Sequence, residues 1–175
     1  LKGGVDFIHG EVRGVDPDEK TVELADDELS YDYLVVALGH RLAPEETPGM
    51  LEGWKETDAV YPFYHFEAAM ELRDGPADFE GGTFVVSVPD TPIKCGGATL
   101  KMTMLAEDYF RRQGIRDDVE VVMTKPSDAI FGVSPYREKL EEIWAERDID
   151  SELHFTVSEI DYENQLVHSE EGKTQ

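Results

Sequence analysis

The 175-residue sequence has few cysteines, few basic side chains and no long apolar run. Its one cysteine, Cys95, excludes a disulfide within the chain and is typical of a reducing compartment. No apolar run approaches the roughly 18–20 residues that a membrane span requires, and no signal peptide is recognisable. These absences predict a cytoplasmic protein.

Basic residues are also scarce, since 16 Lys and Arg stand against 39 Asp and Glu, a net charge of −23. The acids are spread along the whole sequence, which argues against a disordered acidic tail. Such a surface repels phosphates and excludes a nucleic-acid partner. Strong self-repulsion is tolerated where molar salt shortens the Debye length to about 3 Å. We therefore expect a halophilic, haloarchaeal source.

What the sequence does contain is enough apolar material for a core, with 40% hydrophobic and 10% aromatic residues. The apolar run 34–39 does not alternate, which predicts a strand buried on both faces. Strands alternate with helices over most of the remaining residues. The predicted fold is α/β, a Rossmann-like parallel sheet with flanking helices and β-hairpin or meander additions. Expected strands are 5–12, 21–24, 34–39, 83–88, 119–124 and 153–157, with a final hairpin around 163–164; expected helices are 66–73, 98–112 and 134–147.

The stretch 81–101 contains the most distinctive chemistry. A β-rich run ends at Pro89, and the loop after it lacks the G-x-G-x-x-G of a phosphate-binding turn. Cys95 lies there instead, at the start of the expected helix, where the helix dipole and the adjacent Lys94 favour a thiolate. Gly96 and Gly97 let a planar group approach the backbone. From these residues alone, a buried structural cysteine stays open as the alternative.

Several segments resemble the sulfide:quinone oxidoreductase family, FAD-dependent members of the pyridine nucleotide-disulfide oxidoreductase superfamily. The segments are Thr91-Pro92-Ile93-Lys94-Cys95-Gly96-Gly97-Ala98 with Lys101, then Glu107–Gly114, Ile130–Val133 with the helix carrying Leu140, and upstream Tyr31–Gly39. The resemblance implies an enzyme that oxidises sulfide on FAD and passes the electrons to a membrane quinone. It also implies that the sulfur product is held between two redox cysteines.

The resemblance assigns roles to individual residues. Cys95 matches the first redox cysteine, and Lys94 and Lys101 match basic residues that would stabilise a thiolate or persulfide. FAD would approach Gly96 and Gly97. It would also contact the turn Ala37, Leu38 and Gly39, in which Leu38 replaces the usual threonine. No metal site is expected.

The same resemblance implies a domain organisation. Residues 1–45 correspond to a partial FAD-domain meander with its central strand, 46–60 to a linker or domain crossing, and 61–175 to a Rossmann-like, NAD-binding-like middle domain. Because the sequence begins at Leu1 and ends just after a strand signal, we expect an internal fragment of a longer polypeptide. The fragment alone is expected to lack turnover and proper FAD binding, whereas the full-length enzyme would sit peripherally on a membrane surface. Homo-oligomerisation stays open.

Two other functions remain alternatives. A type II NADH dehydrogenase-like domain would require a glycine fingerprint after Val88 and an acidic residue after the next strand; the sequence has Pro89–Lys94 and Lys125 at these places. The second alternative is a non-enzymatic thiol redox or interaction domain. The aromatic cluster Tyr61, Phe63, Tyr64 and Phe66 is predicted to be core packing, with a substrate-channel lining as the more specific hypothesis.

The charge excess predicts salt-dependent stability. We expect the melting temperature of the chain to rise by more than about 10 °C between 0.1 and 3 M KCl, because added salt screens repulsion among the carboxylates. A thermal melt followed by circular dichroism at each salt concentration measures this. A melting temperature independent of KCl would contradict the halophile hypothesis.

Overall fold

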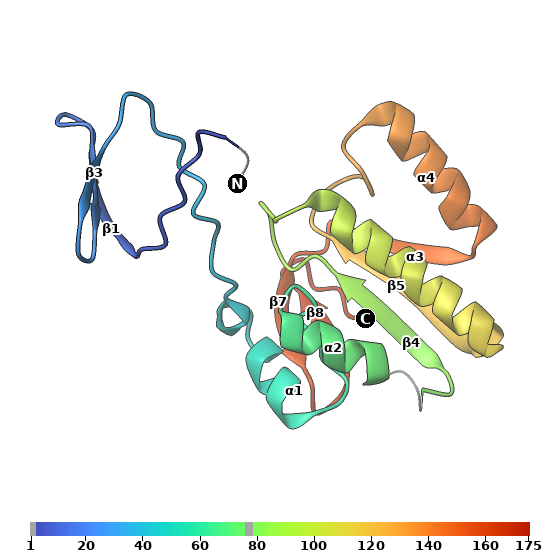
Figure 1. Cartoon of the computed structure of the whole chain (residues 1–175). Coiled ribbons are helices and arrows are strands. Elements are labelled where there is room, and N and C mark those ends of the chain that lie inside the picture. Colours follow the sequence, from blue (N-terminus) through green and yellow to red (C-terminus); the bar gives the residue numbers. More distant parts are fainter. Residues whose placement is uncertain (1–2, 76–78) are drawn as a thin grey trace. The chain divides into compact units, whose positions relative to one another are not determined.

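The computed structural model describes residues 3–75 and 79–175, which belong to two compact units, Leu1–Arg41 and Leu42–Gln175 (Figure 1). The first unit is a small antiparallel meander. The second contains the parallel sheet and all the helices described here.

The meander of the first unit consists of β1 (Val12–Asp16), β2 (Thr21–Leu24) and β3 (Glu28–Ser30), paired in that order. The carboxylate of Asp16 accepts the N–H groups of Asp18 and Glu19, both at 2.9 Å, which closes the turn between β1 and β2. The expected second strand is confirmed. The expected strand over 5–12 is wrong, because pairing with β2 begins only at Val12.

The expected central strand over 34–39 is also wrong. These residues have no strand assignment, and Val35 and Leu38 are 87% and 74% exposed. A strand buried on both faces requires pairing neighbours and a covering layer on each side. None of the residues described in 3–41 supplies them to this segment, so its apolar side chains remain uncovered within the unit.

The parallel sheet of the second unit confirms the predicted fold class. Its strands β4 (Gly82–Ser87), β5 (Val119–Lys125) and β6 (Ile149–Leu153) pair in sequence order, all parallel. The first crossover contains α3 (Gly96–Gln113) and the short 3-10 helix η3 (Arg116–Asp118), and the second contains α4 (Ser134–Glu146). In Figure 1, α3 lies over β4 and β5.

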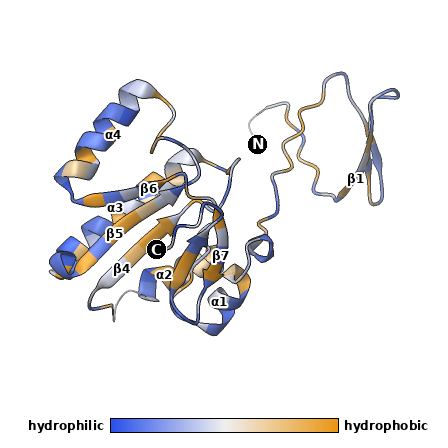
Figure 2. Cartoon of the chain, turned by 180° about the vertical axis from the view of Figure 1, so that it is seen from behind, coloured by the Kyte–Doolittle hydropathy of each residue, from blue (hydrophilic) through white to orange (hydrophobic). Residues whose placement is uncertain are grey.

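The core lies between α3 and the sheet. Phe110 is fully buried, and its ring lies 5.6, 5.2 and 5.6 Å from the ring centroids of Phe79, Phe84 and Tyr109. Burying one such side chain contributes about 3 kcal/mol. The edge strand β4 and the central strand β5 carry the most hydrophobic stretch of the sheet (Figure 2). Gly114 ends α3 with a φ of 77°, as the sequence predicts.

The last part of the chain forms a hairpin of β7 (Val157–Asp161) and β8 (Leu166–Ser169). This confirms the turn expected around 163–164. The strand expected over 153–157 is wrong, since β6 ends at Leu153 and β7 begins at Val157. The break follows from His154, whose φ of 51° turns the backbone out of the extended conformation.

Residues 46–60, expected to be a linker, are structured. The 3-10 helix η1 (Pro44–Glu46) is followed by α1 (Met50–Glu56), which packs against β7, and later by α2 (Phe66–Asp74). Gly49 begins α1 with a φ of 77°, and a Cβ there would lie 1.9 Å from the carbonyl oxygen of Ile160. The helix expected over 66–73 is confirmed, whereas the domain boundaries stay a prediction.

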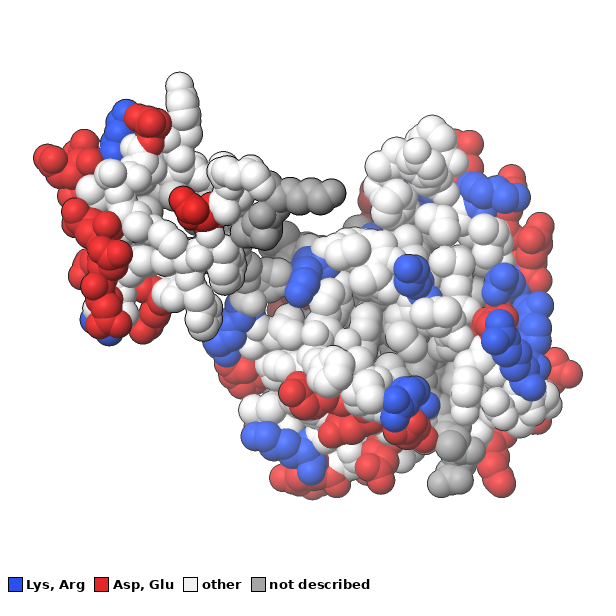
Figure 3. Space-filling model, viewed as in Figure 1, with Lys and Arg blue, Asp and Glu red and all other residues white. Residues whose placement is uncertain are grey.

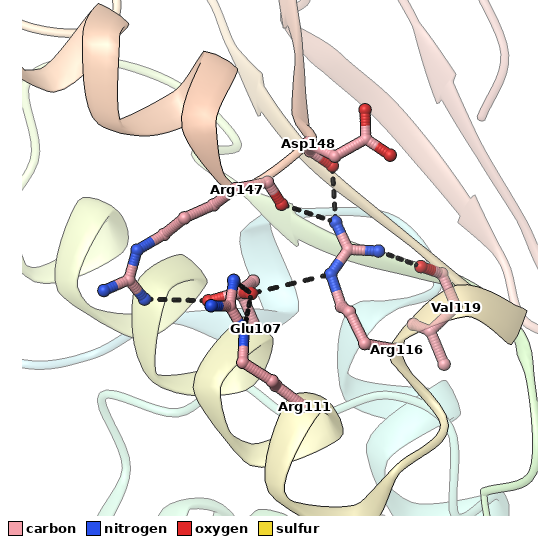
Figure 4. Close-up of polar contacts among 6 residues, drawn as sticks. All are labelled: Glu107, Arg111, Arg116, Val119, Arg147 and Asp148. Atoms are coloured by element: carbon pink, nitrogen blue, oxygen red, sulfur yellow. Dashed lines mark hydrogen bonds and ion pairs between the residues drawn. The ribbon is translucent and has the colours of Figure 1, made fainter.

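A buried carboxylate on α3 joins this helix to η3 and to the end of α4 (Figure 4). Glu107 is fully buried and is surrounded by three guanidinium groups, those of Arg111, Arg116 and Arg147. Arg147 donates to Glu107 Oε2 at 2.8 Å, and Arg111 Nε donates to Oε1 at 2.9 Å. The Nη1 group of Arg116 donates to the Val119 carbonyl, and its Nη2 group donates to the carbonyls of Arg147 and Asp148. One carboxylate thus fixes the end of α4 against α3.

Glu107→Gln is expected to lower the free energy of unfolding by about 3 kcal/mol, because it leaves three guanidinium groups without their buried counter-charge. Asp108→Asn is the matched control on the same helix. Asp108 pairs at 2.8 Å with Arg112, whose side chain is 76% exposed, and its loss should cost below about 1 kcal/mol. Urea unfolding at constant high salt compares the two, and equal stability of both variants would contradict the role given to Glu107.

Candidate functional site

The loop that carries Cys95 crosses the carboxyl edge of the parallel sheet. At its start, the Val88 N–H donates to the Thr124 carbonyl at 2.9 Å, and the Pro89 carbonyl accepts the Val157 N–H at 2.9 Å. The Thr91–Pro92 peptide bond is cis. Ligands of open α/β sheets bind at the carboxyl ends of the strands. The loop therefore lies at the edge where chemistry is expected.

Cys95 is the N-cap residue of α3, with φ 60° and ψ 83°, in the left-handed region. Its carbonyl accepts the Ala98 N–H at 3.0 Å, which begins the helix. The residue is exposed. The alternative of a buried, space-filling cysteine is therefore wrong, and the thiol is accessible to a reagent from outside.

Tyr64 contacts the backbone of this loop from the turn that precedes α2. Its hydroxyl donates to the Lys94 carbonyl at 2.5 Å and lies 3.2 Å from the Cys95 carbonyl. The Lys94 ammonium lies 5.9 Å from the centroid of the Tyr64 ring. Burial raises the pKa of the Tyr64 hydroxyl, and the charge of Cys95 raises it further. Sequence reasoning placed Tyr64 in an aromatic cluster and missed this contact, which joins residues thirty positions apart.

Gly96 and Gly97 face open space. A Cβ built on either would meet nothing within 4 Å among the described residues, and neither has a positive φ. Nothing described within the chain therefore requires glycine at these two positions. The bare backbone at the start of this 18-residue helix therefore leaves room for another group to approach without meeting a side chain of these two residues.

The structure brings only some of the expected site residues together. Lys94, Cys95, Gly96 and Gly97 are consecutive on the loop and the first turn of α3. Lys101 is exposed on the same helix. It lies six residues after Cys95, which is about 9 Å along the helix axis at roughly 1.5 Å per residue. The expected FAD turn 37–39 lies in the first unit, in exposed coil, with Gly39 at φ 74°.

The end of β5 lacks the acidic residue that would bind an NADH ribose. Lys125 is there, and its ammonium donates to the carbonyls of Ala129 and Ile130 at 3.3 and 3.1 Å. Burial lowers the pKa of Lys125, partly offset by the charge of Asp128. This arrangement disfavours the NADH dehydrogenase alternative.

Within residues 3–75 and 79–175, no cluster of three or more His, Cys, Asp or Glu side chains is arranged to hold a metal ion. No helix in the same ranges is both long and apolar enough to cross a membrane. On the visible face in Figure 3, acidic side chains are spread over both units.

Comparison with known proteins places these features in context. No family model matches the chain. The mitochondrial sulfide:quinone oxidoreductase of Mus musculus is 32% identical over 163 residues, which are 91% of this chain and 36% of that protein. The crystal structure of the sulfide:quinone oxidoreductase from Aquifex aeolicus superposes with a TM-score of 0.66 at 24% identity, covering 97% of this chain and 40% of that one.

The fold is shared more widely. A FAD-dependent pyridine nucleotide-disulphide oxidoreductase from Desulfovibrio vulgaris superposes with a TM-score of 0.51 at 19% identity, covering 94% of this chain and 40% of that one. The chain spans between 34% and 40% of the length of the curated relatives it matches. Over about nine tenths of its residues, this chain is related in sequence and fold to the sulfide:quinone oxidoreductases.

Proposed function

We propose that the complete protein is an FAD-dependent sulfide:quinone oxidoreductase in which Cys95 is the first of two redox cysteines. One observation carries the proposal: an exposed cysteine opens α3 at the carboxyl edge of the sheet, next to two glycines that face open space. The similarity to sulfide:quinone oxidoreductases covers this loop and supports the same assignment.

The chemistry follows from the position of the thiolate. The sulfur of hydrosulfide joins the Cys95 sulfur as a persulfide, and this oxidation releases one proton and two electrons. FAD would supply the two-electron acceptor, from which the quinone would take the electrons. Gly96 and Gly97 would leave the backbone open to the flavin, and Lys94 and Lys101 would add positive charge that stabilises the sulfur anion.

The remaining assignments belong to the same proposal. Residues 1–45 would form part of the FAD domain, with Ala37, Leu38 and Gly39 contacting the cofactor through the main chain. Residues 61–175 would form the middle domain. The quinone is a membrane lipid, so the complete protein would meet the membrane surface peripherally. This chain by itself is expected to show no sulfide-dependent turnover.

Cys95→Ser in the complete protein is expected to lower sulfide-dependent reduction of a soluble quinone by more than about 100-fold, because a hydroxyl cannot carry the persulfide sulfur. Quinone reduction followed by absorbance measures the rate. Ser134→Ala, which removes an exposed hydroxyl bonded to Glu138, is the control and should retain the rate. A Cys95→Ser rate equal to that of the wild type would reject the redox role.

Gly97→Ala separates stability from function. In this chain it should raise the free energy of unfolding by about 0.5–1 kcal/mol, since alanine favours the helix and the site has space. In the complete protein the added methyl group should obstruct the flavin and weaken FAD binding about tenfold.

Gly132→Ala is the control for this pair of measurements, because a Cβ there also meets nothing within 4 Å and the residue lies outside the Cys95 loop. Denaturant unfolding and titration with FAD are the two readouts. Unchanged FAD affinity in Gly97→Ala would argue that the flavin does not approach this glycine.

A further inference from the structure

We propose that Tyr64 is a positioning residue for Cys95. Its hydroxyl holds the backbone of Lys94 and Cys95 in the conformation that presents the thiol at the start of α3. The effect on catalysis rests on the function proposed above, whereas the effect on the backbone of Cys95 does not.

The contact is a three-centre hydrogen bond. A phenol has one proton, which points chiefly to the Lys94 carbonyl at 2.5 Å and secondarily to the Cys95 carbonyl at 3.2 Å. The Cys95 carbonyl also accepts the Ala98 N–H at 3.0 Å. Two consecutive carbonyls therefore accept hydrogen bonds. The Lys94 carbonyl accepts from Tyr64, and the Cys95 carbonyl accepts from both Tyr64 and the Ala98 N–H.

Cys95 needs such an external contact. A φ of 60° is unfavourable for any residue with a Cβ, and it persists only where the surroundings enforce it. The side chain of Cys95 makes no capping hydrogen bond at the start of α3. Among the described residues, the Tyr64 hydroxyl is the side-chain donor recorded on these two carbonyls.

Tyr64 is itself held by its surroundings. The turn before α2 is closed by the His65 N–H, which donates to the Pro62 carbonyl at 2.9 Å. The ring of Phe63 lies 5.0 Å from that of Tyr64, and the Lys94 ammonium lies 5.9 Å from the centroid of the Tyr64 ring. A donor fixed by a separate element can impose its geometry on the loop.

The protonation state of the hydroxyl suits this task. Burial and the neighbouring Cys95 raise the pKa of Tyr64, which favours the neutral phenol over a phenolate that would have no proton to donate. The Lys94 ammonium lies 5.9 Å from the centroid of the Tyr64 ring.

The test is Tyr64→Phe, which removes the hydroxyl and retains the ring beneath Lys94. Tyr61→Phe is the matched control: its hydroxyl donates to the Asp58 carbonyl at 2.6 Å in the same segment but makes no recorded contact with the Cys95 loop. Backbone NMR of this chain reports the φ of Cys95 through its Cα shift and its HN–Hα coupling. Steady-state kinetics of the complete protein report kcat and KM.

In Tyr64→Phe we expect the Cα shift and the HN–Hα coupling of Cys95 to show that its backbone has left the left-handed region. We expect kcat to fall about tenfold, with the KM for quinone within twofold of the wild-type value. Tyr61→Phe should change neither. Unchanged Cys95 signals in Tyr64→Phe would overturn the proposal, and so would a normal kcat when the signals have moved. If the wild-type protein lacks sulfide-dependent turnover, the proposed function fails, and the NMR comparison alone decides whether Tyr64 holds Cys95.

Discussion

The parallel pairing of β4 with β5 is the constraint on which the second unit depends. It places the carboxyl ends of both strands at one edge, so the chain that leaves β4 must cross that edge before α3 can return along the sheet. Phe110, fully buried beneath α3, fixes the helix on the sheet. The start of α3, and Cys95 with it, is thereby held at the edge where α/β proteins bind ligands.

Buried charge completes this arrangement. Glu107 forms ion pairs with three arginines: Arg111 on α3, Arg116 on η3 and Arg147 at the end of α4. Its ion pairs hold the C-terminal half of α3, while the Tyr64 hydroxyl holds the loop at the other end. Polar contacts therefore fix this long helix near both ends, and two of them, Tyr64 to Lys94 and Arg147 to Glu107, join residues 30 and 40 positions apart.

The sequence predicted the helices, strands and turns that depend on nearby residues. The helix that ends at Gly114, the strands 83–88 and 119–124 and the hairpin after Asp161 follow from periodicity and turn residues, and the structure confirms them. The run 34–39 failed, because a buried strand depends on neighbours that the first unit does not supply. The prediction of a strand over 153–157 failed because the backbone turns at His154, and a histidine side chain gives no sequence signal for a positive φ.

The candidate site divides in the same way. Sequence alone could group Lys94, Cys95, Gly96 and Gly97 as a candidate site, because these four residues are consecutive. Tyr64 was not, because its contact with the loop depends on how α2 packs rather than on any local signal. The cluster around Glu107 was also missed, since Arg147 lies forty residues away and joins it only in the folded chain.

In the proposed reaction, the Cys95 sulfur carries the sulfur of the oxidised substrate. Mass spectrometry can detect this sulfur in the complete protein after treatment with sulfide in the presence of FAD and trapping by alkylation. The peptide containing Cys95 should gain the mass of one sulfur atom and lose it on reduction. A Cys95 peptide that never gains sulfur, in protein that is reducing quinone with sulfide, would contradict it.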